Sequence, residues 1–280
     1  MGVTLVVRRL QRVIRLMWHV LMGVAVTYAV MLPLNKMGYR RHQRVVVQWW
    51  ARKACRILHL QISSEGACST QPTLFVANHI SWLDIPCLLS KLDAVCVSKH
   101  EIKHWPLVGS MARHAGTVFI RRGEHSAAEV AEHMARTLAG NKNIVLFPEG
   151  TSTSGETVRT FHSRLYQAAI HTHSMVQAVA LAYPHAAGVN PVAPYMGDVT
   201  LFQHLWRVAG EPAMAVKLTF CTPLPTTSGR RTLAADTHSQ IMFALKKSRP
   251  TPEKLRRGLI LKTFEPQRPF LSLRLALQLQ

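Results

Sequence analysis

The residues TLFVANHISWLD, from Thr73 to Asp84, give the clearest indication of the fold. Its first five residues are mostly apolar and predict a strand buried on both faces, and the apolar run that follows Asp84 predicts a helix. The polar residues Asn78, His79 and Asp84 therefore lie where a buried strand turns into a helix. Such strand ends are favourable places for reacting side chains.

Similar short apolar runs recur along the chain. They predict further strands at residues 94–98, 117–121, 143–147, 176–182 and 216–221, and apolar residues three to four apart predict helices at 127–138, 163–171 and 234–246. This alternation predicts an α/β fold with a sheet covered by helices. We expect an N-terminal membrane anchor with a basic amphipathic region (1–60), a catalytic domain (61–230), and a basic C-terminal helix and tail (231–280).

The charge of the chain predicts a polyanionic partner. Lys and Arg number 34 against 14 Asp and Glu, which gives a net charge of +20, while 48% of the residues are hydrophobic. The charge is spread along an apolar chain, which favours anionic membrane lipids over nucleic acid. The five cysteines form no CxxC pair and have no metal-like spacing, so we expect reduced thiols in a cytoplasmic compartment and no metal.

Residues 16–34 predict a membrane-associated helix. They are almost continuously apolar, and His19 is their only ionisable residue. Arginines precede the segment and basic residues follow it, so a helix that crosses the bilayer and a helix that lies in one leaflet both fit. No cleavage signal follows, and we expect the segment to stay in the mature protein.

His79 and Asp84 form the first candidate catalytic constellation. An imidazole oriented by a carboxylate suits removal of a proton from a hydroxyl, because its pKa lies near neutrality and the carboxylate fixes its tautomer. On one ideal helix the two residues would lie about 140° apart. The pairing therefore requires His79 to lie in the turn before the helix.

Two further constellations follow predicted strands. Arg121 and Arg122 close the run GTVFIRRG, and such a pair suits bidentate binding of a phosphate or carboxylate. Glu149 and several hydroxyl groups follow in FPEGTSTSG, where they suit the polar head of an acceptor. Backbone amides near Gly150, or at the helix start after His79, are candidate donors to an oxyanion.

In this order and at these distances, NHISWLD, FIRR and FPEGT resemble the glycerophosphate and lysophospholipid acyltransferases that carry the HxxxxD motif. The resemblance covers residues 74–183 and implies a glycerol-3-phosphate acyltransferase-like fold. It implies that His79 is the general base, oriented by Asp84. It also implies that Arg121 or Arg122 contacts an acceptor phosphate and that the acceptor site includes the following residues: Glu149, Gly150 and Thr151.

The resemblance further implies transfer of a fatty acyl group from acyl-CoA or acyl carrier protein to a lysolipid, without a cofactor, at the cytoplasmic face of a bacterial inner membrane. Two departures bear on the acceptor. Ala178 replaces a Pro of the family's fourth motif, and residues 161–167, FHSRLYQ, look more like members that acylate lyso-ornithine lipids. Lysophosphatidic acid and lyso-ornithine lipid therefore both remain candidate acceptors.

Two alternative hypotheses for the function involve different chemistry. Ser81 or Cys87 would carry the acyl group in a covalent mechanism, although no GxSxG elbow is present. A non-catalytic basic protein that binds membranes or nucleic acid would explain the charge, but it leaves the ordered His, Arg and Glu motifs unexplained.

Overall fold

A seven-stranded sheet organises the fold. The computed structural model describes residues 2–38, 40–120, 124–186 and 188–248, all within one compact unit, Met1–Arg249. The strand order is β1-β9-β6-β2-β5-β3-β4, and β9 pairs with β6 antiparallel whereas all other neighbours in the sheet are parallel. The strands are β1 (Leu60–Glu65), β2 (Thr73–Ala77), β3 (Ala94–Lys99), β4 (Val118–Ile120), β5 (Asn143–Leu146), β6 (Met175–Ala182) and β9 (Met214–Phe220). A separate pair consists of β7 (Pro184–His185) and β8 (Gly188–Val189).

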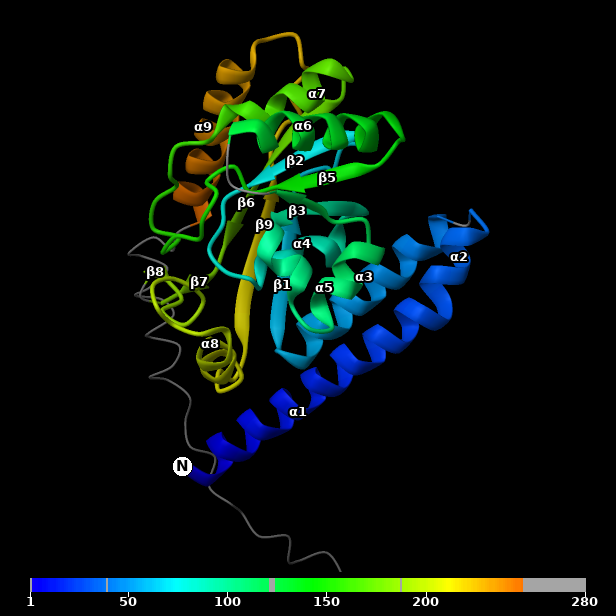
Figure 1. The fold of residues 1–280 in the computed structure, drawn as a ribbon. Helices are drawn as coiled ribbons and strands as arrows, with labels where there is room; N and C mark the ends of the chain where they lie inside the picture. The colour runs from blue at the N-terminus through cyan, green and yellow to red at the C-terminus, as the bar shows by residue number, and fades with distance from the viewer. Residues whose placement is uncertain (1, 39, 121–123, 187, 249–280) are drawn as a thin grey trace, which may run out of the picture. The chain divides into compact units, whose positions relative to one another are not determined.

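Helices cover both faces of the sheet (Figure 1). One face packs on α3 (Arg40–Ile57), α4 (Asp84–Lys91) and α8 (Leu201–Val208), and the other on α6 (Glu124–Ala139), α7 (Gln167–His171) and α9 (Arg230–Ser248). The central strand β2 is buried throughout because Phe75 and Ala77 enter the first core while Leu74 and Val76 enter the second. This two-residue alternation explains why the strand reads as a continuous apolar run.

The remaining helical elements precede α3, follow β3 or, in the case of η3, directly precede α7. They are α1 (Gly2–Val26), a π-helical segment η1 (Thr27–Met31), α2 (Leu32–Lys36), the 3₁₀ helices η2 (His100–His104) and η3 (Ser163–Tyr166), and α5 (Val108–His114). The predicted apolar segment thus belongs to a longer helix that starts at Gly2. The continuous helical stretch Gly2–Leu34 is long and apolar enough to cross a membrane.

The expected α/β fold with a helix-covered sheet is confirmed. The strands predicted within the sheet match β2, β3, β4, β5, β6 and β9 to within two residues at each end in the described part of the chain. The edge strand β1 was not predicted, because only Leu60 of its six residues is buried and its sequence LQISSE reads as polar. Ala178 lies inside a continuous β6 and pairs with Val76, so the strand persists without the family's Pro.

Candidate active site

His79 and Asp84 meet at the end of β2. The strand ends at Ala77 and α4 begins at Asp84, so His79 lies in the intervening turn, as the pairing requires. His79 Nδ1 lies 2.8 Å from Asp84 Oδ2, and the side chains are 21% and 0% exposed, respectively. With the proton on Nδ1 donated to the carboxylate, the lone pair of Nε2 is the basic site of the ring.

The carboxylate of Asp84 accepts four hydrogen bonds. Besides His79, the backbone N–H groups of Ile80 and Ser81 donate to Oδ2 at 2.7 and 2.9 Å. The hydroxyl of Tyr183 donates to Oδ1 at 2.7 Å. These donors compensate a buried negative charge and fix the orientation of the carboxylate.

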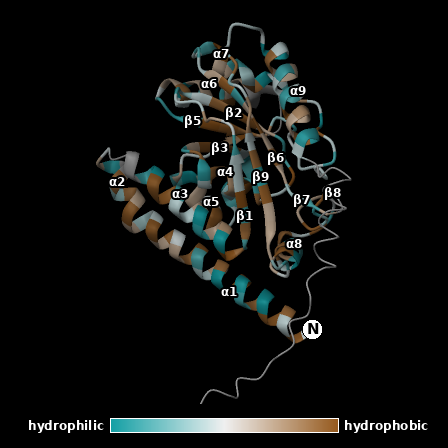
Figure 2. Cartoon of the chain, turned by 180° about the vertical axis from the view of Figure 1, so that it is seen from behind, coloured by the Kyte–Doolittle hydropathy of each residue, from teal (hydrophilic) through white to brown (hydrophobic). Residues whose placement is uncertain are grey.

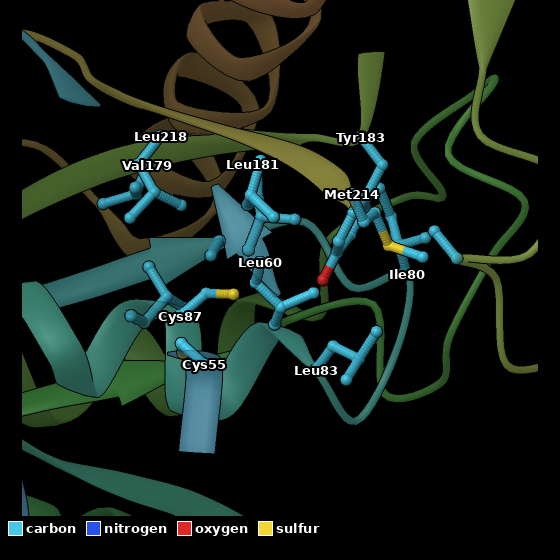
Figure 3. Packing of buried hydrophobic residues seen from close by; sticks show 14 of the residues in the cluster. Cys55, Leu60, Ile80, Leu83, Cys87, Val179, Leu181, Tyr183, Met214 and Leu218 are labelled. Carbon is cyan, nitrogen blue, oxygen red and sulfur yellow. The ribbon is translucent and has the colours of Figure 1, made fainter. Parts of the chain in front are cut away.

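Tyr183 is a member of the site that the sequence did not reveal. It follows β6 and is buried in the core between the sheet and α4, where Figure 3 shows it beside Ile80 and Met214. Burial and the neighbouring Asp84 raise the pKa of Tyr183 well above its usual value, so its hydroxyl stays protonated as a donor. The only sequence signal was a tyrosine directly after the last residue of an apolar strand.

Residues that follow β5 contact both the ring and the backbone of His79. The ring of Phe147 stacks on His79 with 4.2 Å between centroids. Glu149 Oε1 accepts the backbone N–H of His79 at 2.7 Å, and Oε2 accepts the N–H of Arg159 at 2.8 Å. Both oxygens of Glu149 thus accept backbone donors, and burial raises the pKa of this carboxyl.

Further contacts hold the turn around His79. The backbone N–H of Thr153 donates to the carbonyl of His79 at 2.8 Å, and Asn78 exchanges two hydrogen bonds with the backbone of Leu181 on β6. Gly155 has φ +79°, and a Cβ there would lie 2.8 Å from Ile80 Cδ1. The third motif therefore packs directly against the first.

Trp82 connects the same turn to α8. Its indole Nε1–H donates to His204 Nδ1 at 2.9 Å, so His204 carries its proton on Nε2 and donates it to the carbonyl of Pro194 at 3.1 Å. Burial lowers the pKa of His204, which favours this neutral form. Neither Tyr183 nor His204 has a sequence spacing that ties it to the motif.

The structure describes some of the other expected site residues and not others. Arg121 and Arg122 lie outside the described residues, but β4 ends at Ile120 on the edge of the sheet where the parallel strands β2 and β5 also end. Gly150 is exposed with φ +68°, and Thr151 is partly exposed. Their contact with an acceptor stays a prediction, as does that of Glu149.

The structure bears on the candidate oxyanion donors and on the alternative of a covalent mechanism. The amides of Ile80 and Ser81 at the helix start already donate to Asp84, and the amide of Gly150 donates to the carbonyl of Phe147 at 3.2 Å, so both regions stay candidate oxyanion sites. The side chains of Ser81 and Cys87 are buried, and burial raises the pKa of the Cys87 thiol well above its usual value. Neither is presented to a substrate as a nucleophile.

Comparison with known proteins gives a consistent result. Residues 59–182 match the model of a family described as acyltransferase. The chain is 36% identical to a lyso-ornithine lipid O-acyltransferase of Pseudomonas aeruginosa over 71% of this chain and 78% of that protein. It is also 36% identical to a 1-acyl-sn-glycerol-3-phosphate acyltransferase of Neisseria gonorrhoeae, over 64% of this chain and 71% of that protein.

A solved structure has the same fold. The lysophosphatidic acid acyltransferase PlsC of Thermotoga maritima aligns with a TM-score of 0.66 and 18% identity, over 89% of this chain and 99% of that one.

Proposed function

This chain belongs to the acyltransferase family, and we propose that it transfers a fatty acyl group from an acyl thioester to the free hydroxyl of a lysolipid. The observation that carries the mechanism is the hydrogen bond between His79 Nδ1 and the buried carboxylate of Asp84. It leaves Nε2 of a partly exposed imidazole as the proton acceptor. The relatives named above, which act on two kinds of lysolipid, support the acceptor class.

The reaction needs one general base and no acyl-enzyme. Nε2 of His79 takes the proton of the acceptor hydroxyl while its oxygen attacks the thioester carbonyl carbon. The tetrahedral intermediate then collapses, the carbon–sulfur bond breaks, and the imidazolium returns the proton to the departing thiolate. The products are the diacyl lipid and the free thiol. Asp84 stabilises the imidazolium during both steps because its carboxylate lies 2.8 Å from Nδ1.

The acceptor and the donor are each one of two candidates. Lysophosphatidic acid would present a phosphate to Arg121 or Arg122, whereas a lyso-ornithine lipid would present a carboxylate and an amine. Of the segment that departs from the phosphatidic-acid pattern, Phe161 and Tyr166 are buried, while the exposed His162 lies beside Gly150. This places one residue of the departing segment close to the proposed acceptor site. The acyl donor is acyl-CoA or acyl carrier protein.

The protein acts at a membrane surface, and its N-terminal helix lies in one leaflet. The buried residues of α1 are Arg12, His19 and Gly23, all on one side of the helix. The opposite side exposes apolar side chains, among them Leu10, Ile14, Met17, Trp18 and Leu21, and Figure 2 shows apolar and polar residues mixed along the helix. This division into a buried side and an exposed apolar side suits a helix that lies in the interfacial plane. A free-standing helix that spans the bilayer does not need such a division. We place the active site at the cytoplasmic face of a bacterial inner membrane.

Contacts along the length of α1 support this interfacial placement. Arg12 reaches the carbonyl of Pro212 at 3.0 Å, His19 Nε2 lies 3.0 Å from the carbonyl of Trp50, and Tyr28 bonds to Ser110 at 2.8 Å. These contacts extend from the middle of α1 to η1, just after it, and join the segment to α3, to α5 and to the loop after α8. The helix therefore runs along the rest of the described chain and does not lead away from it through a bilayer.

An acceptor panel tests the proposed function. The purified protein in vesicles is given radiolabelled acyl-CoA or acyl carrier protein with lysophosphatidic acid, lyso-ornithine lipid or lysophosphatidylethanolamine, and products are separated by thin-layer chromatography. We expect one labelled diacyl lipid to dominate. Failure to form a diacyl product with any lysolipid and either donor would refute the proposal.

A further inference from the structure

We propose that α8 is a second lipid-contacting element, which inserts Phe202 and Trp206 into the membrane interface beside α1. This inference rests on the membrane association in the proposed function. It extends that association from the N-terminal helix to α8, which lies about 200 residues later in the chain. It also gives α8, whose role the sequence did not indicate, a physical function.

The two faces of α8 differ sharply. His204, Leu205 and Val208 are buried against the catalytic unit. On the other side, Phe202 is 64% exposed and its ring stacks on that of Trp206 at 6.4 Å. Two neighbouring aromatic rings at a surface are costly in water but suit the boundary between headgroups and acyl chains.

Arginines of α1 hold the end of α8. The guanidinium of Arg12 donates to the carbonyls of Ala209 and Pro212 at 3.3 and 3.0 Å, and that of Arg8 donates to the carbonyl of Gly210 at 3.0 Å. These carbonyls follow the C-terminus of α8, where the helix dipole and the unpaired carbonyl groups attract cations. Two arginines expected only to flank a membrane helix therefore join α1 to α8.

The exposed surfaces of the two helices adjoin. The guanidinium of Arg9 lies over the ring of Trp206, 5.6 Å from its centroid. Both views of the fold place α8 next to the N-terminal half of α1, where Val3, Val6 and Leu10 are exposed (Figures 1 and 2). Phe202 and Trp206 therefore extend the apolar face of α1 sideways onto the catalytic unit.

The surroundings favour a lipid occupant over a protein. Arg9 beside Trp206, and the exposed Arg207 on α8, supply positive charge next to the aromatic pair. Aromatic rings flanked by arginines match an anionic lipid surface, in which the rings enter the interface and the guanidinium groups bind phosphates. A surface continuous with a membrane-facing helix must also approach the same bilayer.

Docking of α8 would orient the catalytic turn. His204 on the buried side of α8 accepts the indole N–H of Trp82, which lies between His79 and Asp84. Lipid contact on one side of α8 is thus linked through His204 and Trp82 to the turn that contains His79. The depth of α8 in the interface would set the distance of His79 from the membrane surface. The hydroxyl of the lysolipid acceptor lies at that surface.

Probe placement tests the inference with a matched control. Phe243 on α9 is 73% exposed, similar to Phe202, but α9 covers the opposite face of the sheet. Full-length Phe202→Cys and Phe243→Cys proteins, each with Cys68→Ser and Cys221→Ser, carry a polarity-sensitive fluorophore in phosphatidylcholine–phosphatidylglycerol vesicles. We expect the emission at position 202 to shift to shorter wavelength and to be quenched by lipids with a nitroxide on the acyl chain, and position 243 to show neither.

Three outcomes would overturn the inference. Quenching at position 202 no greater than at 243 would show that α8 does not touch lipid. A shifted emission that lipid nitroxides do not quench would assign the surface to a second copy or another protein. Lack of vesicle binding by the whole protein would exclude α8 and α1 together.

Acyl transfer measured in the same vesicles separates this inference from the proposed function. Transfer without quenching at 202 rejects only the docking of α8, whereas quenching without transfer to any lysolipid rejects only the proposed function. In addition, Phe202→Ser is expected to lower partitioning into the vesicles about tenfold, because the serine variant no longer removes an exposed aromatic side chain from water. Phe243→Ser is expected to leave it unchanged, and equal effects of the two would contradict the inference.

Discussion

Asp84→Asn should separate the fold of the site from its chemistry. The amide oxygen of Asn replaces Oδ2 and still accepts from His79, Ile80 and Ser81, while the amide nitrogen faces the hydroxyl of Tyr183, which rotates to accept. The geometry of the turn is thereby kept. What the substitution removes is the negative charge beside the imidazolium that forms during catalysis.

The distance between the groups sets the expected loss. For opposite unit charges 2.8 Å apart, an effective dielectric constant of about 20 gives an attraction of about 6 kcal/mol. Because the His79 side chain is 21% exposed, solvent screens part of this attraction. We therefore expect kcat to fall by roughly 10³- to 10⁴-fold, given that each 1.4 kcal/mol is a factor of about ten.

The assay compares kcat for acyl transfer with the thermal unfolding midpoint of the same preparation. Asp236→Asn, an exposed position on α9, is the matched control and should retain wild-type turnover. An Asp84→Asn protein that unfolds at the wild-type temperature and retains more than about a tenth of wild-type kcat would refute the electrostatic role of Asp84.

Three further substitutions test neighbouring parts of the site. Tyr183→Phe leaves Asp84 Oδ1 buried without its donor, so we expect urea unfolding to show a loss of about 1–3 kcal/mol and a smaller loss of kcat than in Asp84→Asn; unchanged stability would count against this bond. Burial raises the folded-state pKa of Glu149 above the value of about 4.3 that the carboxyl has in the unfolded chain. The protonated carboxyl therefore stabilises the fold below about pH 4.3, and this stabilisation is lost as the pH rises through the raised pKa. The stability of the wild type relative to Glu149→Gln should therefore decrease between pH 4 and 7, and a difference independent of pH would contradict the assignment. Arg121→Ala should raise the KM of an anionic acceptor more than that of the acyl donor, and equal increases would argue against phosphate binding.

The sequence predicted six of the seven strands of the sheet, because the central strands are buried on both faces and read as apolar runs. In β2, four consecutive apolar residues after Thr73 predicted a strand buried on both faces. The edge strand β1 was missed because one buried residue leaves no period to detect. Short helices such as α8 were missed for a similar reason, since eight residues give about two turns of pattern.

The candidate site was predictable only where its residues are close in sequence. His79 and Asp84 lie in one turn, and their pairing followed from the requirement that the histidine precede the helix. Tyr183 and His204 reach the same turn from 99 and 122 residues away from their partners, and only the pairing of strands and helices brings them there. Glu149 was found, but its contacts with the backbone of His79 and Arg159 depend on the loop conformation, which residue types do not reveal.

The amphipathic character of α1 depends on its neighbours in the same way. Read alone, residues 16–34 are apolar on nearly every side, whereas the full helix from Gly2 turns Arg12, His19 and Gly23 toward the catalytic unit. At Gly23 a Cβ would lie 2.5 Å from Trp50 Nε1, so the glycine permits the close approach of α1 and α3. We propose the interfacial placement over the spanning one because of these contacts with the rest of the described chain, which the sequence of the helix alone does not reveal.

Acyl transfer by His79→Ala tests most directly whether His79 is the general base. The variant is purified beside the wild type and His171→Ala, an exposed histidine on α7, and each is assayed with labelled acyl thioester and the preferred lysolipid. We predict that His79→Ala unfolds at a temperature close to that of the wild type and forms no diacyl product above background, while His171→Ala is fully active. Product formation by folded His79→Ala at a rate near that of the wild type would contradict the assignment of the general base.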